Sequence, residues 1–287
     1  MRNLRKRLFF IITMFAFLFA AQNVSAQKHH KKHSKDDMEQ VETEPDAPVK
    51  KSWHDEPLET PELADLSGHG MIMNGNARRG NINKNSNINN NFTEGIDISH
   101  YQGSINWDLV SEEPISYVYI KATEGASYVD RYYEYNRSEA RRVGLSVGSY
   151  HFYRPNISPK VQFANMTRIV KPEEQDLVPL IDIEFRGKEH KSKFIADLRE
   201  FVEMVTAHYG KKPLLYTYHN FYNNHLLGEF GDYQFMIARY QSNEPWLNDG
   251  KDYIMWQYSD KGRISGIKGH VDRSRIMGSY KLHELGM

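Results

Sequence analysis

From residue 95 onward, the spacing of apolar residues changes along most of the chain between a strand-like pattern and a helical pattern. Short apolar runs bounded by polar residues are typical of buried strands, whereas apolar residues three and four positions apart are typical of helices. Phe194, Leu198, Phe201 and Val205 show the helical spacing clearly, and the apolar run at 214–218 shows the strand pattern. The alternation predicts a succession of strand–helix units.

Eight strands and four helical stretches are expected from this pattern. The strands are expected at 95–99, 116–122, 145–153, 178–185, 214–218, 234–240, 253–258 and 270–273, and the helical stretches at 131–143, 159–170, 194–210 and 221–227. Gly144 and Gly210 are suitable C-terminal caps for two of these helices. Because long helices cease after the sixth strand, we predict an α/β fold: a modified (β/α) TIM-like barrel with early β/α units and an irregular, β-rich last third.

The first 26 residues have the three parts of a secretory signal peptide. Basic residues precede an apolar run from 8 to 21, and small residues at 24–26 provide a cleavage site. The run is shorter than the ~20 apolar residues that a membrane span needs. We therefore expect an exported protein of the periplasm, cell envelope or extracellular space, with no membrane span after signal cleavage. An uncleaved anchor is the alternative.

Residues 27–92 have the composition of a linker. A basic, histidine-rich run leads into an acidic stretch with prolines, and nine of the eighteen residues from 74 to 91 are asparagine. Such a segment has too little apolar surface to offset the entropy of ordering. The expected organisation is a signal peptide at 1–26, a disordered low-complexity linker at 27–92 and a catalytic domain at 93–287.

Composition excludes several kinds of chemistry. The chain has no cysteine, which excludes disulfides, thiol catalysis and cysteine-ligated metals. From residue 93 to 287 there are 24 lysines and arginines against 26 aspartates and glutamates, a net charge of −2. A nucleic-acid partner would favour a basic surface, so we expect none. The many tyrosines suit a groove for sugars, but tyrosine at strand spacing is equally typical of strand packing.

Two acids in an apolar run are the strongest chemical signal. Asp182 and Glu184 are separated by one residue within the strand expected at 178–185, so their side chains should share one face with Cα atoms roughly 6.5–7 Å apart. Burial and mutual repulsion raise the pKa of at least one such carboxyl, which keeps an acid protonated near neutral pH. The alternative is a surface strand end whose acids pair with Arg186 and Lys188.

Two further acids fall on expected strands. Asp97 lies on the first strand and Asp272 on the last. In a barrel of this type, catalytic groups gather at the carboxyl ends of the strands. Either acid could instead pair with an arginine, and Asp272 has Arg273 and Arg275 beside it. Four acids at corresponding strand ends favour a catalytic role over a structural one.

These residues resemble the family 25 glycoside hydrolases. The motifs that carry the resemblance are GIDISHYQ at 95–102, YIKATEG at 119–125, GSYHF at 148–152, DIE at 182–184, YT at 216–217, ARY at 238–240, WQY at 256–258 and the segment 266–272. The resemblance covers 93 to about 277. It departs at Met236, where the family usually has tryptophan, and at residues 273–276, which leaves details of the sugar subsites open.

The resemblance implies a lysozyme that cleaves the β-1,4 bond between N-acetylmuramic acid and N-acetylglucosamine in the glycan strands of peptidoglycan. Glu184 would be the general acid and base, Asp182 would face the positive charge at the anomeric carbon, and Asp97 and Asp272 would tune this pair. Two schemes remain open: attack by the substrate's own acetamido group, or direct attack by water with inversion. The expected substrate-binding residues are Tyr150, Tyr216, Tyr218, Tyr240, Gln257, Lys121 and Glu124. Neither scheme requires a metal or an organic cofactor, and we expect a monomer.

Other classes are less well supported. No glycine-rich phosphate loop or HExxH motif is present, and the scattered His100, His151, His219 and His270 form no recognisable metal set. His151 is expected to satisfy a hydrogen bond in the core. A chitinase-like hydrolase is the nearest enzyme alternative, but Leu180 stands where its motif would need an aspartate. A non-catalytic module that binds cell-wall glycan on the same barrel is the alternative from another class.

Overall fold

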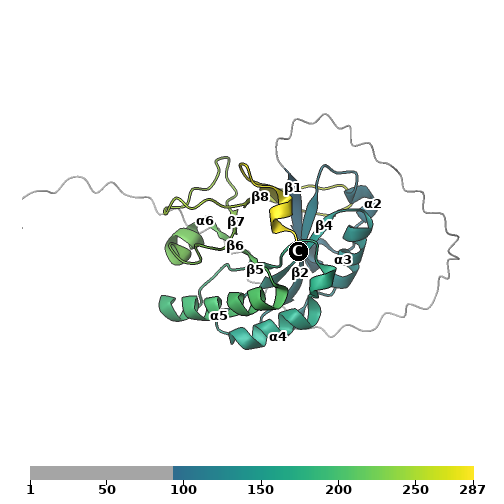
Figure 1. Ribbon diagram of the computed structural model, residues 1–287. Helices are drawn as coiled ribbons and strands as arrows, with labels where there is room; N and C mark the ends of the chain where they lie inside the picture. The colour runs from purple at the N-terminus through teal and green to yellow at the C-terminus, as the bar shows by residue number, and fades with distance from the viewer. Residues whose placement is uncertain (1–92) are drawn as a thin grey trace, which may run out of the picture. The chain divides into compact units, whose positions relative to one another are not determined.

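The computed structural model describes residues 93–287 (Figure 1), so the predicted signal peptide at 1–26 and linker at 27–92 lie outside the described residues. The strands are β1 (Glu94–Ile98), β2 (Tyr117–Glu124), β3 (Tyr128–Val129), β4 (Ser146–Phe152), β5 (Leu180–Asp182), β6 (Leu214–Tyr218), β7 (Phe235–Ala238), β8 (Met255–Gly262) and β9 (Val271–Ile276). The helices are α2 (Trp107–Val110), α3 (Tyr133–Arg142), α4 (Pro159–Ile169), α5 (Lys191–Tyr209) and α6 (His219–Phe221), with a π-helical turn at Tyr222–Leu226 and 3₁₀ turns at His100–Gln102, Pro172–Glu174 and Leu282–Leu285.

Eight of the described strands close into a barrel. The order is β1-β9-β8-β7-β6-β5-β4-β2, and β1 pairs with β2 to complete the ring, while β3 forms a short antiparallel pair with β2. Within the ring, neighbouring strands from β1 through β2 and β4 to β8 run parallel, whereas β9 is antiparallel to both β8 and β1. The prediction of a modified TIM-like α/β barrel is confirmed.

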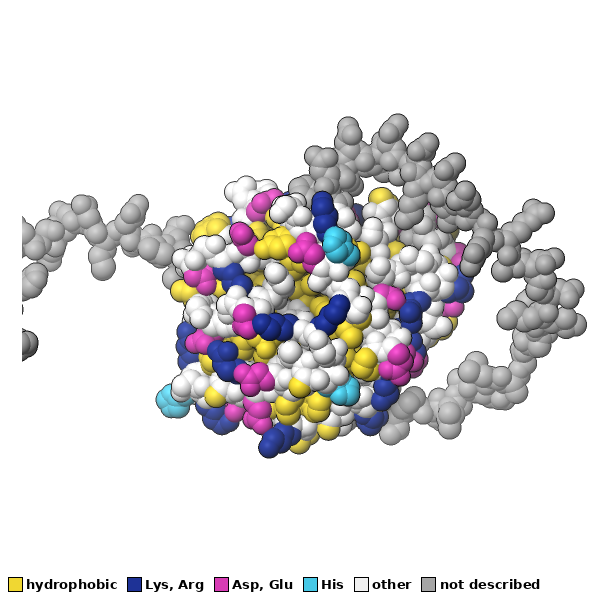
Figure 2. Space-filling view, viewed as in Figure 1, with side chains coloured by type: hydrophobic (Ala, Val, Ile, Leu, Met, Phe, Trp, Pro, Cys, Tyr) yellow, Lys and Arg dark blue, Asp and Glu magenta, His cyan; other side chains and the backbone are white. Residues whose placement is uncertain are grey.

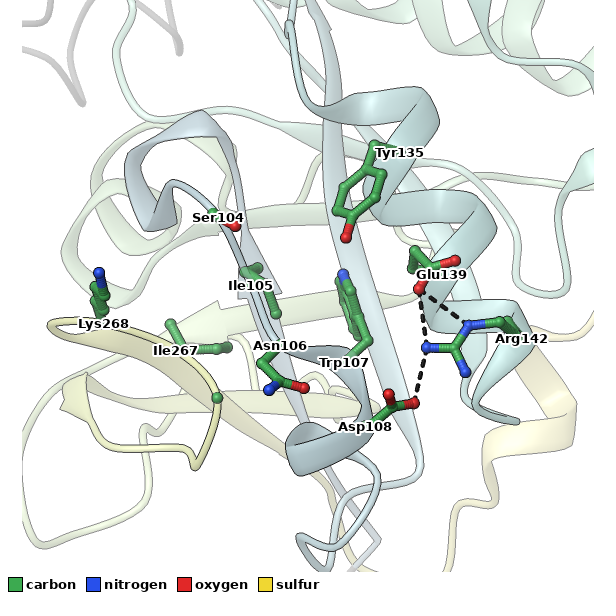
Figure 3. Close-up of a pocket in the computed structure, with 11 residues that line it drawn as sticks. Ser104, Ile105, Asn106, Trp107, Asp108, Tyr135, Glu139, Arg142, Ile267 and Lys268 are labelled. Carbon is green, nitrogen blue, oxygen red and sulfur yellow. Dashed lines mark hydrogen bonds and ion pairs between the residues drawn. The ribbon is translucent and has the colours of Figure 1, made fainter. Parts of the chain in front are cut away.

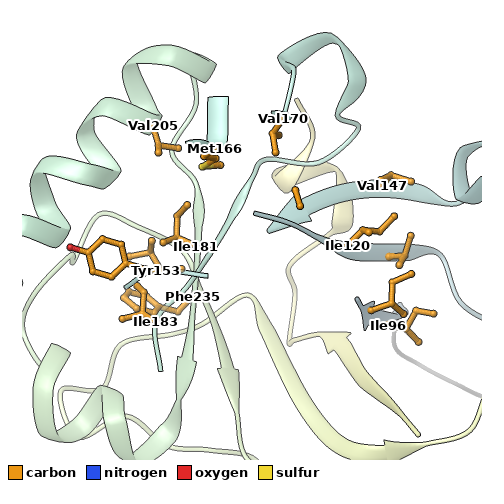
Figure 4. Packing of buried hydrophobic residues seen from close by; sticks show 14 of the residues in the cluster. Ile96, Ile120, Val147, Tyr153, Met166, Val170, Ile181, Ile183, Val205 and Phe235 are labelled. Atoms are coloured by element: carbon orange, nitrogen blue, oxygen red, sulfur yellow. The ribbon is translucent and has the colours of Figure 1, made fainter. Parts of the chain in front are cut away.

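Buried apolar side chains form two layers, one on each side of the barrel wall. The outer layer packs the strands against the helices and includes Ile96, Ile120, Ile181 and Val205 (Figure 4). The inner layer fills the barrel with alternate residues of the same strands, among them Tyr117 and Tyr119. This alternation follows from the two-residue period of a strand.

Glycine makes room for one of these inner rings. A Cβ atom at Gly148 would lie 2.2 Å from Cε1 of Tyr119, so a larger residue at this position of β4 would collide with the ring. Tyr119 is fully buried, and its hydroxyl donates to the carbonyl of Val178 at 3.2 Å. Some of the tyrosines therefore pack between strands, which was one of the two roles expected from the sequence.

Several element boundaries differ from the prediction. The strand expected at 178–185 is wrong in extent: the ladder covers only Leu180–Asp182, because the chain leaves the sheet where the barrel opens. The last two strands extend further than expected, to Gly262 and Ile276. The short β3 and α2 have too few residues to show a period. Gly144 and Gly210 follow their helices with φ of 86° and 72°, which confirms the expected caps.

Within residues 93–287 no helix has the length and apolar character that crossing a membrane requires. On the face shown in Figure 2, acidic and basic side chains are interspersed over the surface.

Candidate active site

A cavity of about 440 Å³ opens at the end of the barrel where the parallel strands finish. All four candidate acids line it, together with Lys121, Tyr150, Tyr216 and Gln257 from the expected substrate-binding set. Its other lining residues are Ile98, Ser99, Tyr101, Gln102, Phe152, Leu180, Asp260, Lys268, Gly269 and His270. The barrel thus brings residues almost 180 positions apart into one concave site.

Asp182 and Glu184 come from β5 and the segment that follows it. Asp182 is paired with Phe152 on β4 and with Tyr216 on β6, and its side chain is only 8% exposed. The amide of Ile183 donates to the carbonyl of Tyr216 at 2.9 Å and its side chain is buried in the outer layer. The extended backbone therefore continues one residue past the ladder, and both acids face the cavity.

Asp97 and Asp272 meet at the seam of the barrel. They are directly opposite each other in the antiparallel pairing of β1 with β9. The expectation that every acid lies at the carboxyl end of its strand is wrong for Asp272, which is the second residue of β9. Because β9 is antiparallel, its amino end lies at the same end of the barrel as the carboxyl ends of its neighbours. The reversed strand therefore still delivers its acid to the cavity.

Gln257 connects the seam to the tyrosines. Its Oε1 accepts hydrogen bonds from the hydroxyls of Tyr216 at 2.9 Å and Tyr240 at 2.7 Å, and its Nε2 donates to Oδ2 of Asp97 at 3.1 Å. The hydroxyl of Ser274 lies 3.5 Å from the same oxygen of Asp97. This network fixes the amide orientation of Gln257, since only its nitrogen can donate to a carboxylate.

The buried phenols at the site remain protonated at neutral pH. Burial raises the pKa of Tyr150 well above its usual value, and the negative charges of Asp182, Asp130, Asp272 and Asp97 raise it further. Burial likewise raises the pKa of Tyr216, with smaller contributions from its tyrosine neighbours and from Glu184 and Asp182. Tyr150 can therefore donate a hydrogen bond to a substrate, whereas Tyr216 already donates its single hydroxyl proton to Gln257 and can offer its oxygen as an acceptor.

A cationic and aromatic cluster forms one wall of the cavity. The ammonium of Lys121 lies 2.6 Å from Oε2 of Glu124 and 5.1 Å from the centre of the Phe152 ring. The guanidinium of Arg154 contacts Glu124 and lies 4.6 Å from the same ring. Burial opposes ionisation of Glu124, but the charges of Lys121 and then Arg154 outweigh it and lower the pKa of this carboxyl. Glu124 thus holds Lys121 in place at the cavity wall.

Three expected substrate-binding residues lie behind the lining. Tyr240 reaches the site through Gln257, Glu124 through Lys121, and Tyr218 packs edge-on against Tyr216 with ring centres 6.0 Å apart. Sequence reasoning missed Tyr101, Phe152, Asp260, Lys268 and His270. Tyr101 and Phe152 belong to the quoted motifs, so their positions in those motifs were a usable signal. Asp260 lies on the part of β8 beyond the expected strand end, and Lys268 lies in the β8–β9 connection, where the sequence has no regular pattern.

His151 has the core role that the sequence predicted. It is fully buried, its Nδ1 lies 2.8 Å from the hydroxyl of Thr123, and its Nε2 lies 3.3 Å from Oε1 of Gln162. Burial lowers the pKa of this imidazole to about 4. His151 is therefore neutral at physiological pH and holds β4 to β2 and α4.

Comparison with known proteins identifies the class. The family described as Glycosyl hydrolases family 25 matches residues 96–267. Uncharacterized protein YegX of Escherichia coli K12 is 35% identical over 190 residues, which cover 64% of this chain and 70% of YegX. Lysozyme M1 of Streptomyces globisporus is 32% identical over 200 residues, covering 65% of this chain and 68% of that protein. A family 25 glycosyl hydrolase structure from Bacillus anthracis superposes with a TM-score of 0.63 at 28% identity, covering 68% of this chain and 94% of that one.

The chain belongs to glycosyl hydrolases family 25. It is an enzyme, a glycoside hydrolase of the lysozyme or muramidase type.

Proposed function

We propose that this protein hydrolyses peptidoglycan by cleaving the β-1,4 bond between N-acetylmuramic acid and N-acetylglucosamine. The observation that carries the proposal is the set of four carboxylates, Asp97, Asp182, Glu184 and Asp272, which line one cavity of a family 25 barrel. Glycoside hydrolysis needs one carboxyl group to protonate the leaving oxygen and a second group to stabilise positive charge at the anomeric carbon.

Glu184 is the proposed general acid. It lines the cavity together with the three other acids, where a carboxyl group can protonate the glycosidic oxygen as the bond breaks. Once the leaving sugar has departed, the Glu184 carboxylate can accept a proton from the incoming water. The same residue therefore acts first as acid and then as base.

Asp182 is the proposed partner of the substrate acetamido group. In this scheme the acetamido oxygen attacks the anomeric carbon, and ionised Asp182 orients the acetamido N–H and stabilises the charge that develops on it. Direct attack by water with inversion is the competing scheme, in which Asp182 would be the base. Asp182 is largely buried at the cavity wall, where it is paired with Tyr216 of β6. This position supports contact with a substituent of a sugar bound in the cavity.

The remaining residues have proposed positioning roles. Asp97 and Asp272 would hold sugar hydroxyls and contribute negative charge, while Gln257 keeps Asp97 and the two tyrosine hydroxyls in register. Tyr150 can donate to an acetamido or hydroxyl oxygen because its phenol stays protonated, and the oxygen of Tyr216 can accept from a sugar hydroxyl while its proton is donated to Gln257. Lys121 would complete the substrate-binding set, while Tyr218, Tyr240 and Glu124, behind the lining, would hold Tyr216, Gln257 and Lys121 in position.

The biological setting follows as part of the same proposal. Matches include the Autolytic lysozyme of Clostridium acetobutylicum, and a substrate in the cell wall requires an exported enzyme. We propose that residues 1–26 direct export, that 27–92 are a linker and that 93–287 form the catalytic domain acting as a monomer.

Digestion of purified peptidoglycan tests the proposal. Identification of the newly formed reducing ends should show N-acetylmuramic acid. Ends in N-acetylglucosamine would contradict the proposed bond, and cleavage of chitin in preference to peptidoglycan would favour the chitinase alternative. Binding to glycan without any new reducing ends would identify a non-catalytic wall-binding module.

A further inference from the structure

A second hollow lies on the flank of the barrel, outside the cavity that holds the four acids. Its volume is about 590 Å³, within the ~300–1,000 Å³ range of small-molecule sites. Three segments form it: residues 104–108 after β1, the exposed side of α3, and residues 266–268 of the β8–β9 connection (Figure 3). We call it the flank groove.

The walls of the flank groove are preformed. The amide of Asn106 donates to the carbonyl of Gly266 at 2.9 Å, which ties two segments 160 positions apart. Gly266 has φ of +89°, and a Cβ atom there would lie 2.3 Å from the Asn106 carbonyl oxygen, so only glycine allows this approach. Trp107 is 1% exposed and forms the floor, with its indole N–H directed to Oδ1 of Asn136 at 3.4 Å.

The charges around the flank groove balance. Nη2 of Arg142 lies 2.8 Å from Oδ1 of Asp108 and 2.8 Å from Oε2 of Glu139, so this guanidinium is held between two carboxylates (Figure 3). Lys268 supplies the second positive charge. Two acids and two bases leave no net charge to attract a polyanion, and the groove is better suited to a neutral polar ligand.

The remaining lining has the chemistry of a sugar site. Tyr135 on α3 is 51% exposed, and its hydroxyl is directed into the groove (Figure 3). An aromatic ring provides an apolar surface for one face of a pyranose, and its hydroxyl can bond to the ring substituents. The Ser104 hydroxyl and the side-chain amide of Asn106 add further polar groups on the opposite side of the groove.

The flank groove and the cavity share one wall. Lys268 lines both, Gly266 and Ile267 line the groove, and Gly269 and His270 line the cavity. The two sites are therefore adjacent, separated only by the short segment 266–270 that leads to Asp272.

We infer that the flank groove is a second glycan site, which binds an uncharged, N-acetylated amino-sugar segment of the wall polymer next to the cavity. The inference rests on the proposed function, since it takes the same polymer as the ligand. Its role is to hold insoluble glycan close to the four acids, and it adds no catalytic group.

Substitution of Tyr135 in the full chain tests the inference. Binding to intact, cross-linked peptidoglycan, whose muramic carboxyl groups are blocked by peptide, is measured by co-sedimentation in the Glu184→Gln background, so that the polymer is not cut. Tyr135→Ala should weaken this binding about threefold to tenfold, the loss expected for an aromatic contact, whereas Tyr135→Phe should stay within about twofold. Trp246→Ala removes another exposed aromatic, 58% exposed and outside the groove, and is the matched control.

A kinetic comparison separates the flank groove from the cavity. With active enzyme, Tyr135→Ala should lower kcat/KM on the insoluble polymer by about the same factor, and leave a soluble tetrasaccharide, too short to reach both sites, within about twofold. Equal losses on both substrates, unchanged polymer binding, or competition by free stem peptide but not by soluble N-acetylglucosamine oligomers would each overturn the inference. If wild-type enzyme releases no reducing ends while Tyr135→Ala still weakens binding, the proposed function fails and the glycan site stands.

Discussion

The two parts of the barrel reach the same end by different routes. From β2 to β6, the helices α3, α4 and α5 separate successive parallel strands, and each of these strands contributes to the cavity lining, for example through Lys121, Phe152 and Tyr216. From β7 to β9, the described chain contains no helix between strands, and β9 runs in the opposite direction. Asp182 comes from the first part and Asp272 from the second. Position at one end of the barrel, rather than strand direction, decides which residues enter the site.

The two parts also cover their outer faces differently. Helices bury the outer side chains of the early strands, including Ile181 and Val147. On the helix-free strands, the guanidinium of Arg275 lies 4.5 Å from the centre of the Trp256 ring, and the hydroxyl of Tyr258 donates to Glu94 at 2.8 Å. A layer of arginine and aromatic side chains thus replaces the helices that a regular barrel would have here.

Glu184→Gln should have the largest effect on activity. The amide is nearly isosteric but cannot donate a proton, so turnover of peptidoglycan should fall by ~10²- to 10⁴-fold with the fold intact. Release of reducing ends measures turnover, and circular dichroism checks the fold. Glu203→Gln, on the exposed side of α5, is the matched control. Turnover at the wild-type rate would exclude Glu184 as the general acid, and Asp182 would then be the only candidate catalytic acid from the first part of the barrel.

Asp182→Asn should reduce kcat by about 10²-fold with little change in KM, because the charge that Asp182 stabilises exists mainly in the transition state. Removal of the substrate N-acetyl group should be nearly as harmful, and the two changes together should cost little more. NMR of the first-formed product anomer distinguishes the schemes. An initial α-anomer would contradict participation of the acetamido group and make Asp182 a general base.

His151 should make the helix-covered part sensitive to acid. Its pKa is about 4 in the folded protein and 6.5 in the reference state, so the unfolded chain binds a proton first as the pH falls. The free energy of unfolding should therefore decrease from pH 6.5 downward, by about 3 kcal/mol at pH 4. Urea titrations at several pH values measure it. His151→Gln should flatten this dependence, whereas His283→Gln at an exposed site should not.

Gln257→Leu, on the helix-free strands β7–β9, should have the smallest effect of the four substitutions. It removes the acceptor for two tyrosine hydroxyls and the donor to Asp97, while the acids themselves remain. We expect kcat/KM to fall about tenfold, since a lost positioning contact costs on the order of 1–2 kcal/mol. Gln234→Leu, exposed just before β7, is the control. An unchanged rate would show that the network at the seam does not position Asp97 for catalysis.

The sequence predicted best the elements whose signal is local and repeated. The helices α3, α4 and α5 begin and end within about three residues of the expected bounds, because apolar spacing and glycine caps mark them. The end of β5 was not predictable, since Ile183 and Phe185 continue the alternation after the ladder has stopped. The direction of β9 was also hidden, because alternation is the same for parallel and antiparallel strands. Asp260 and Lys268 enter the cavity only through barrel closure, which has no local signature.

The pairing of β1 with β9 has a consequence for synthesis. It joins residues 94–97 to residues 272–275, so the ring cannot close until almost the whole domain has left the ribosome. Contacts between such distant residues form late, because the loop entropy must be overcome first. Asp97 and Asp272 are themselves opposite each other in this pairing. A nascent chain therefore has no complete set of acids, and the site comes into existence only when β9 pairs with β1.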